Sequence, residues 1–271
     1  MLPLKIGASL RIDDITAHRD WLFDSARDLE VPDFIFHEVY KDGWQGTVDR
    51  AKAVLDGFTG RIGIHGPFIG LTIDNADPEL RDVISRRYVQ GVEAAAALGA
   101  RQMVVHSPFD RWTHHHKLAG YGGDAQIVER VRAVMGPALA LAETHGVTLV
   151  VENCKDVDPA DRRRMVEAIG SSAMALSIDT GHAHLAHRIQ GAPPVDGFVR
   201  DAGDRLRHVH IQDLDGHADR HWAPGEGSIH WREVFRALAA CKSAPHLVLE
   251  LRRHTDVPAG FAHLAELGLA A

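Results

Sequence analysis

Residues 208–231 gather five histidines and four carboxylates into one stretch of the chain. A strand pattern at 206–211 leads into this stretch, and a helix pattern at 231–240 follows it. A loop this rich in imidazole and carboxylate is a poor candidate for a hydrophobic core. It is typical of a metal-binding rim of an active site, because imidazole nitrogen and carboxylate oxygen are common ligands of transition metals.

The composition fits a globular chain that buries a sizeable core. Of the 271 residues, 45% are hydrophobic and 25% are charged, which are ordinary values for a soluble domain. The net charge of −7 argues against nucleic acid as the main partner, because phosphate contacts need a basic surface. No apolar run approaches the ~18 residues that a membrane span needs, so a membrane partner is not expected either.

The cysteines and the first residues of the chain bear on its location. Cys154 and Cys241 lie far apart in the sequence, so neither a disulfide framework nor a Cys-x-x-Cys zinc site is predicted. The segment 1–7 lacks the basic and apolar regions of a signal peptide. Both observations favour a cytoplasmic protein.

Short apolar runs alternate with helical patterns along the chain and form eight strand–helix units. The predicted strands are 5–10, 32–39, 61–67, 102–106, 147–152, 174–179, 206–211 and 247–251. The predicted helices are 15–29, 48–58, 77–99, 125–145, 158–169, 231–240 and 261–267, with a proline-interrupted helical segment after 179 and a glycine-rich break at 120–123. Near-continuous apolar strands indicate a parallel sheet with both faces covered.

We therefore predict the α/β class and a (β/α)8 TIM barrel, a fold of ~250 residues, with a single domain over 1–271. A doubly wound open sheet is the alternative. No Gly-x-Gly-x-x-Gly follows an early strand, which disfavours a dinucleotide-binding form of that sheet.

Metal-ligand side chains stand at the ends of the predicted strands. They are Glu38, His65, His106, Glu152, Asp179, His210 and Glu250. In a barrel these ends converge on one mouth, and carboxylates gathered there need a compensating charge. Nitrogen and oxygen ligands without thiolate suit Zn²⁺, Mn²⁺, Co²⁺ or Fe²⁺ better than Mg²⁺ or Ca²⁺. We predict a site for one to three such ions, with His208 in the barrel interior.

A set of short motifs runs from the third predicted strand to the eighth. They are His65-Gly-Pro67, His106-Ser-Pro108, Val151-Glu-Asn153, Asp179-Thr-Gly-His182, His210-Ile-Gln-Asp213, Asp219-Arg-His221, Pro224-Gly-Glu-Gly227 and Glu250. With them the chain resembles the xylose-isomerase-like TIM barrel superfamily, which holds sugar and sugar-phosphate isomerases and epimerases together with apurinic endonucleases of the endonuclease IV type. Together the motifs are specific to the superfamily, although singly none is.

The resemblance implies a metal core of Glu152, Asp179, His210 and Glu250. In the isomerases and epimerases one such metal holds adjacent sugar oxygens, and two glutamates move a proton through a metal-stabilised enediolate. Here Glu152 and Glu250 would be that catalytic pair. His182 would bind the substrate or join the metal shell.

The endonuclease-type relatives carry a larger ligand set that resembles three zinc sites. Five further positions of this set are filled here, as additional ligands or as residues around one ion: His65, His106, His182, Asp219 and His221. A phosphodiesterase with several zinc ions is therefore an alternative function. A dehydratase or lyase using the same enolate chemistry is another, and a barrel that binds metal without catalysis is a third.

The expected substrate is a small sugar, polyol or sugar phosphate. Residues beyond the strand ends could bind it, namely Glu38, Lys155, Trp112 and Arg252 in addition to His182. Exposed loop residues or neutralising charges are the plain alternative for Lys155, Trp112 and Arg252. The resemblance allows a homodimer, and no residue pattern decides the oligomeric state.

Overall fold

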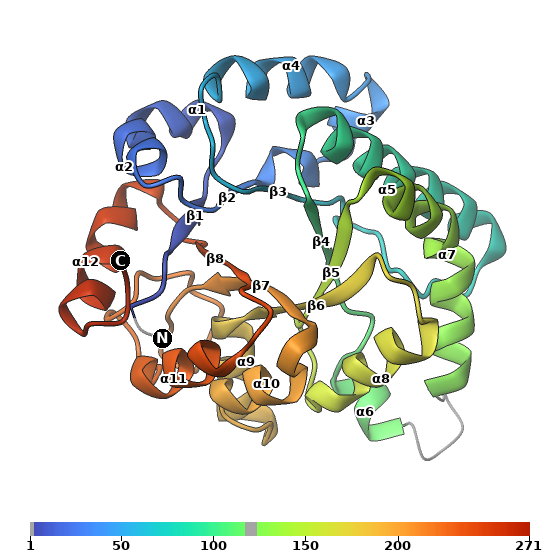
Figure 1. The fold of residues 1–271 in the computed structure, drawn as a ribbon. Helices are drawn as coiled ribbons and strands as arrows, with labels where there is room; N and C mark the ends of the chain where they lie inside the picture. Colours follow the sequence, from blue (N-terminus) through green and yellow to red (C-terminus); the bar gives the residue numbers. More distant parts are fainter. Residues whose placement is uncertain (1–2, 117–123) are drawn as a thin grey trace.

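The computed structural model describes residues 3–116 and 124–271 and shows a closed barrel of eight parallel strands in the order β1 to β8 (Figure 1). The strands are β1 Gly7–Ser9, β2 Leu29–Val31, β3 Ile62–His65, β4 Gln102–His106, β5 Thr148–Glu152, β6 Met174–Asp179, β7 Leu206–Ile211 and β8 His246–Leu249. The last strand pairs with the first, so the sheet has no edge. The predicted α/β class, (β/α)8 TIM barrel and single domain are confirmed. The predicted glycine-rich break at 120–123 lies outside the described residues.

Helices surround the barrel on its outer side (Figure 1). The α-helices are α1 Ile12–Ile15, α2 Arg19–Asp24, α3 His37–Lys41, α4 Gln45–Val54, α5 Pro78–Leu98, α6 Arg111–His116, α7 Asp124–His145, α8 Pro159–Ile169, α9 Thr180–Gln190, α10 Val195–Ala202, α11 Trp231–Ala240 and α12 Val257–Glu266. The core is the layer of buried apolar side chains between these helices and the strands.

Capping residues set the bounds of the predicted long helices. Asp77 accepts a hydrogen bond from the backbone N–H of Glu79 at the start of α5, and Asp158 caps the start of α8 in the same way. Each helix ends before a glycine with positive φ, Gly99 and Gly170, a conformation that glycine adopts without steric cost. These signals are readable in the sequence, and both helices begin and end within a residue or two of the prediction.

The predicted second strand at 32–39 is wrong. The strand is Leu29–Val31, and the residues after it form a 3-10 helix, Pro32–Ile35, followed by α3. Pro32 has no backbone N–H to donate to a strand ladder, and it occupies the first turn of the 3-10 helix instead. Phe34 belongs to that 3-10 helix, and its apolar side chain is buried in the core.

The predicted helix 15–29 is also wrong as a single element. Its residues form the end of α1, a 3-10 turn at Thr16–His18 and α2, and its last residue starts β2. Other predicted elements exist with shifted bounds. The predicted helices 48–58 and 261–267 correspond to α4 and α12, and the predicted strand 247–251 corresponds to β8.

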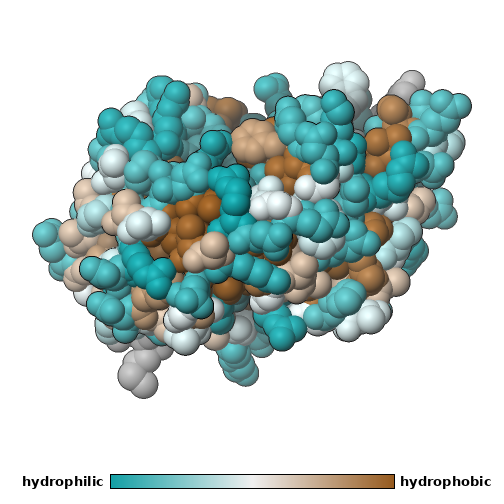
Figure 2. Space-filling view, turned by 90° about the horizontal axis from the view of Figure 1, so that it is seen from above, coloured by the Kyte–Doolittle hydropathy of each residue, from teal (hydrophilic) through white to brown (hydrophobic). Residues whose placement is uncertain are grey.

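The ends of the chain meet beside the barrel. Leu4 forms a parallel bridge with Ala270 and exchanges backbone hydrogen bonds with Leu269 and Ala271. The face in Figure 2 is largely hydrophilic, with hydrophobic residues in small patches between polar ones. Among the described residues, no helix combines the length and apolar character needed to cross a membrane.

Candidate active site

Four donor side chains meet at the carboxyl ends of neighbouring strands. Glu152 ends β5, Asp179 ends β6, His210 lies next to the last residue of β7, and Glu250 follows β8 directly. One ligand atom from each lies within 4.8 Å of the others. The strand register produces this grouping, because Asp179 stands beside His210 and His106 beside Glu152 in the ladders. We call Glu152, Asp179, His210 and Glu250 the central donor group.

The contacts within the central donor group are short and buried. Nδ1 of His210 lies 3.0 Å from Oε1 of Glu152 and 3.5 Å from Oε2 of Glu250. Burial raises the pKa of Glu152, but the charge of His210 and nearby imidazole hydrogen bonds outweigh burial and hold the pKa well below its usual range. Burial lowers the pKa of His210, yet Glu250 and the neighbouring carboxylates bring it well above its usual value. The carboxylates thus favour the protonated, positively charged form of His210 in this part of the barrel.

His65 and His106 form a second group with Glu152. Their Nε2 atoms lie 3.7 and 3.5 Å from Oε2 of Glu152, and 3.3 Å from each other. The ring of His106 stacks on Phe68 at a centroid distance of 4.0 Å. Burial lowers the pKa of His106 to about 3, so its imidazole is neutral at neutral pH and offers a lone pair.

His182, Asp219 and His221 form a third group on the outer side of the rim. The carboxylate of Asp219 lies 3.2 Å from Nε2 of His182 and 3.3 Å from Nε2 of His221. The backbone of His221 has a positive φ of 50°, which is uncommon for a residue with a side chain. Hydrogen bonds hold it there, because its N–H donates to Gln212 Oε1 and its carbonyl accepts from Arg252 N.

The Gln212 side chain connects the third group to the central donor group, and the Asn153 side chain holds the backbone of Asp179. Gln212 Nε2 donates to Oδ1 of Asp179 at 3.2 Å and to Oδ1 of Asp219 at 3.0 Å. Asn153 donates to the carbonyl of Asp179 at 3.1 Å and accepts from its N–H at 2.9 Å. Both carboxylates are therefore held from behind by groups that do not compete for a cation.

Replacing Gly181 by alanine is expected to weaken metal binding about 10-fold, the lower end of what the loss of a ligand's hydrogen-bond partner costs. A Cβ at this position would lie 2.2 Å from Cδ of Gln212, so the amide must leave Asp179 and Asp219. Competition between the protein and a chromophoric chelator for Zn²⁺ measures the affinity. Gly136→Ala is the control, because its Cβ would meet no atom within 4 Å. Equal affinities in the two variants would contradict the role of Gln212.

The predicted substrate-binding residues occupy different places. His182 lies in the third group, and Lys155 is exposed beyond β5. Trp112 lies on α6, where its side chain is 67% exposed and stacks on His116 at 3.9 Å. Arg252 is exposed and lines, with His221, a cavity of about 670 Å³ beside the rim. This cavity has room for a sugar-sized molecule.

Glu38 does not stand at a strand end. It lies on α3, it is exposed, and its carboxylate pairs with His37 at 3.3 Å. The carboxylate that β2 supplies is instead Glu30, which is 1% exposed and contacts both His208 and His210. Sequence reasoning missed Glu30, although a single carboxylate between Leu29 and Val31 was a signal. His208 is buried in the barrel interior, as predicted.

The donor atoms fit a divalent cation. Oε2 of Glu152 is buried and receives no hydrogen bond within the described part of the chain, although buried carboxylate oxygens are normally paired. Glu152 belongs to both the second group and the central donor group. Carboxylate and imidazole donors at this spacing suit Zn²⁺, Mn²⁺, Co²⁺ or Fe²⁺, and a cation would supply the charge that the histidines otherwise carry.

Several curated proteins are similar to the chain in sequence. An uncharacterized protein of Methanocaldococcus jannaschii is 25% identical over 194 residues, which are 68% of this chain and 61% of that protein. The alignment thus spans less than two thirds of the relative. Fructoselysine 3-epimerase of Escherichia coli O157:H7 is 49% identical over 45 residues, which are 17% of this chain and 16% of the enzyme.

Solved structures share the fold over nearly the whole chain. A D-tagatose 3-epimerase-like protein has a TM-score of 0.77 at 20% identity, covering 97% of this chain and 96% of its own. A protein of Thermus thermophilus whose crystal was soaked with ZnCl2 has a TM-score of 0.71 at 24% identity, covering 97% and 98%. At these identities the likeness concerns the fold alone.

The family comparison covers most of the chain. The model of the xylose isomerase-like TIM barrel family matches residues 26–268, from just before β2 to just after α12. The closed eight-stranded barrel and its strand order agree with that match. The chain belongs to the xylose isomerase-like TIM barrel family.

Proposed function

We propose that the protein is a metal-dependent isomerase or epimerase of a small sugar or sugar phosphate. The observation that carries the proposal is the central donor group, in which two glutamates from different strands accompany an aspartate and a histidine within 4.8 Å. Two carboxylates beside a bound sugar can act as base and acid on the same carbon skeleton.

Glu152, Asp179, His210 and Glu250 would hold the metal. When bound, it would act as a Lewis acid that polarises the substrate carbonyl. One glutamate then removes the proton next to that carbonyl, and the other returns a proton to the skeleton. His182 stands beside both Glu152 and Asp179, at 3.6 Å from an oxygen of each. Its Nδ1 is held by the carbonyl of Asn153, so Nε2, which faces Asp219 at 3.2 Å, is the atom that would turn to a sugar hydroxyl or join the metal shell.

Relatives support this reaction class. The matched family is named after xylose isomerase, and proteins with similar folds include the D-tagatose 3-epimerase-like protein and the 3-keto-D-glucoside 4-epimerase of E. coli, which has a TM-score of 0.71 at 18% identity. The cavity beside His221 and Arg252 is the place where a sugar, with or without a phosphate, would extend from the rim. A cytoplasmic location is part of the proposal, and both cysteines are free.

A second candidate is a phosphodiesterase with several zinc ions. The observation that favours it is the presence of three adjacent donor groups, where an epimerase needs only the central one. Neighbouring ions ~3.5–4 Å apart suit in-line attack on a phosphodiester. Cleavage of an abasic-site duplex, compared with conversion of ketoses, separates this candidate from the first.

Removal of the metal is expected to abolish turnover and to lower the melting temperature. The protein would be dialysed against a chelator, assayed by proton exchange between D2O and a panel of ketoses and their phosphates, and then reloaded with Mn²⁺, Co²⁺ or Zn²⁺. An ion present at 1,000 times its Kd stabilises the fold by about 4 kcal/mol, so thermal unfolding gives a readout independent of the substrate.

The number of bound ions and the products decide between the candidates. One tightly held ion with solvent exchange at a sugar carbon supports the epimerase. Two or three zinc ions with cleavage of the abasic-site duplex and no exchange would replace it by the phosphodiesterase. Full turnover after complete metal removal would contradict both.

A further inference from the structure

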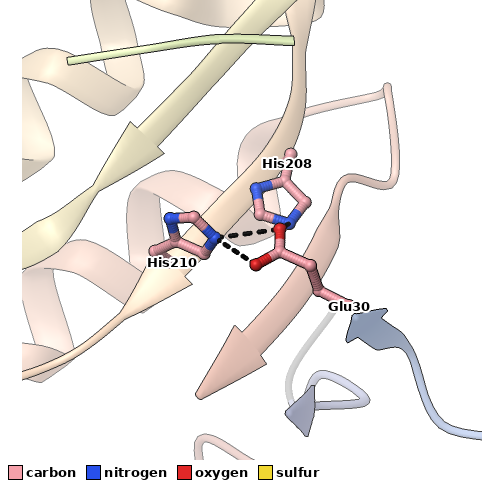
Figure 3. A group of neighbouring side chains, drawn as sticks. All are labelled: Glu30, His208 and His210. Atoms are coloured by element: carbon pink, nitrogen blue, oxygen red, sulfur yellow. Dashed lines mark hydrogen bonds and ion pairs between the residues drawn. The ribbon is translucent and has the colours of Figure 1, made fainter. Parts of the chain in front are cut away.

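A buried carboxylate lies beside the central donor group, and the proposed reaction does not use it. Glu30, in the middle of β2, points into the barrel toward two rings of β7 (Figure 3). Its two oxygens each lie 3.0 Å from Nε2 of His210, and Oε2 lies 3.2 Å from Nε2 of His208. Ser9, on β1, donates its hydroxyl to Oε1 at 2.9 Å.

The partners of Glu30 are all able to donate. An ionised carboxylate only accepts hydrogen bonds, so each ring nitrogen that faces Glu30 carries its hydrogen. The hydroxyl of Ser177 lies 3.0 Å from Nδ1 of His208 and can donate to it, which leaves the ring hydrogen of His208 on Nε2. Nε2 of His210 also carries a hydrogen, because it faces both oxygens of the Glu30 carboxylate.

This arrangement decides which nitrogen of His210 serves the central donor group. Nδ1 of His210 faces Glu152 at 3.0 Å and Glu250 at 3.5 Å. Without a cation Nδ1 therefore carries a hydrogen as well. A cation held by Glu152, Asp179 and Glu250 would replace that hydrogen, whereas Nε2 keeps its own because Glu30 accepts it, so Nδ1 is the nitrogen that would offer a lone pair. Glu30 also fixes the ring plane, because both of its oxygens contact the same nitrogen.

We propose that Glu30 is a positioning residue of the metal site, which holds His210 as the Nε2–H tautomer with Nδ1 directed at Glu152, Asp179 and Glu250. A carboxylate behind a metal-binding histidine fixes its tautomer and orientation and strengthens it as a ligand. The inference rests on the metal site of the proposed function and is independent of the reaction catalysed there.

A separate ion between Glu30, His208 and His210 is the competing interpretation, because their ligand atoms also lie within 4.8 Å of one another. Both oxygens of Glu30 accept a hydrogen bond from Nε2 of His210 at 3.0 Å, and Oε1 also accepts one from Ser9 at 2.9 Å. The serine hydroxyls also complete the set of partners on both sides of the cluster. We therefore assign the contacts of Glu30 with His210 and Ser9 as hydrogen bonds, and the approach of the His208 ring to Glu30 as a close polar contact.

Glu30→Gln tests the assignment through Zn²⁺ binding alone. Glutamine keeps the shape of the side chain, but its NH2 group must face at least one of the three donors. Competition with a chromophoric chelator is expected to show a 10–100-fold weaker affinity at an unchanged number of bound ions. Asp28→Asn is the matched control, because Asp28 is equally buried at 1% but pairs with Arg61 at 2.7 Å. This control is expected to lose stability and to keep the affinity of wild type.

Nitrogen-15 NMR of the histidine rings in the zinc-loaded wild-type protein gives a test that needs no variant. His210 is expected to show Nδ1 bound to zinc and a hydrogen on Nε2. Zinc on Nε2, a wild-type affinity in Glu30→Gln, or the loss of one bound ion in that variant with the affinity of the others unchanged would each overturn the inference. A protein that passes these tests and converts no sugar would leave the inference standing and reject the proposed reaction.

Discussion

Replacing Glu250 by glutamine is expected to lower the rate of proton exchange between one epimer of the substrate and solvent by about 10²–10⁴-fold, the usual contribution of a general acid or base. Glutamine retains an oxygen for the cation but cannot accept the proton. Burial raises the pKa of Glu250, and the charge of His210 offsets this only in part. The carboxyl group is therefore the member of the pair that gains a proton more readily.

The pair of glutamates gives this prediction a reciprocal test. Glu152→Gln is expected to lose exchange of the opposite epimer, because each carboxylate serves one face of the carbon skeleton. Metal content is measured on both variants, so that loss of the ion is separated from loss of the base. The control is Glu266→Gln on the exposed side of α12. Wild-type exchange of both epimers in Glu250→Gln would remove this residue from the mechanism.

Replacing Arg162 by methionine is expected to cost about 3–5 kcal/mol of unfolding free energy, the usual cost of breaking a buried ion pair. Arg162 is 1% exposed, and its guanidinium lies 3.4 Å from the carboxylate of Asp156, which is 2% exposed. It also donates to the carbonyls of Val151 and Ser177. Val151 belongs to β5 and Ser177 to β6, the strands that end in Glu152 and Asp179 of the central donor group.

The pH dependence of this loss has a definite sign. Burial raises the pKa of Asp156 to about 6 even with Arg162 beside it. Without the arginine the pKa rises further above its value in the unfolded chain, so the folded variant loses stability as the pH rises and the carboxyl group ionises. Urea unfolding is therefore expected to show a larger difference from wild type at pH 8 than at pH 5.

A double variant keeps the prediction testable if Arg162→Met does not fold. Asp156→Asn combined with Arg162→Met removes both charges, and it is expected to recover part of the lost free energy. The strands then keep their positions, and so the affinity for Zn²⁺ is retained. An unfolding free energy of Arg162→Met within about 0.5 kcal/mol of wild type, a typical value for surface substitutions, would contradict the account.

The barrel and the order of its units could be predicted, because the residues that mark the start and end of most strands are neighbours in the sequence. The predicted strands 174–179 and 206–211 and the helix 231–240 have the observed bounds, since apolar runs and flanking polar residues mark them in the sequence itself. The second strand could not be found in this way. Its three residues include Glu30, which contacts His208 and His210, and these two residues are distant from it in the sequence.

The same distinction holds for the candidate site. The ends of the predicted strands point to Glu152, Asp179 and His210 from the sequence alone, because parallel strands bring such ends to one mouth. Gln212 was not singled out, since its role depends on the positions of two carboxylates from different segments. Residues that hold a ligand from behind have no characteristic spacing along the chain, and only the folded arrangement identifies them.

The contact between Glu30 and His210 joins residues that are 180 positions apart in the sequence, and the barrel closes only when β8 pairs with β1. Contacts across such long loops carry an entropic cost that must be met before they form, which slows their formation. The central donor group comes wholly from the second half of the chain, whereas Glu30, His65 and His106 come from the first half. The donor group can therefore gather when β5 to β8 pair, but Glu30 reaches His210 only once the first strands have joined the last and the barrel has closed.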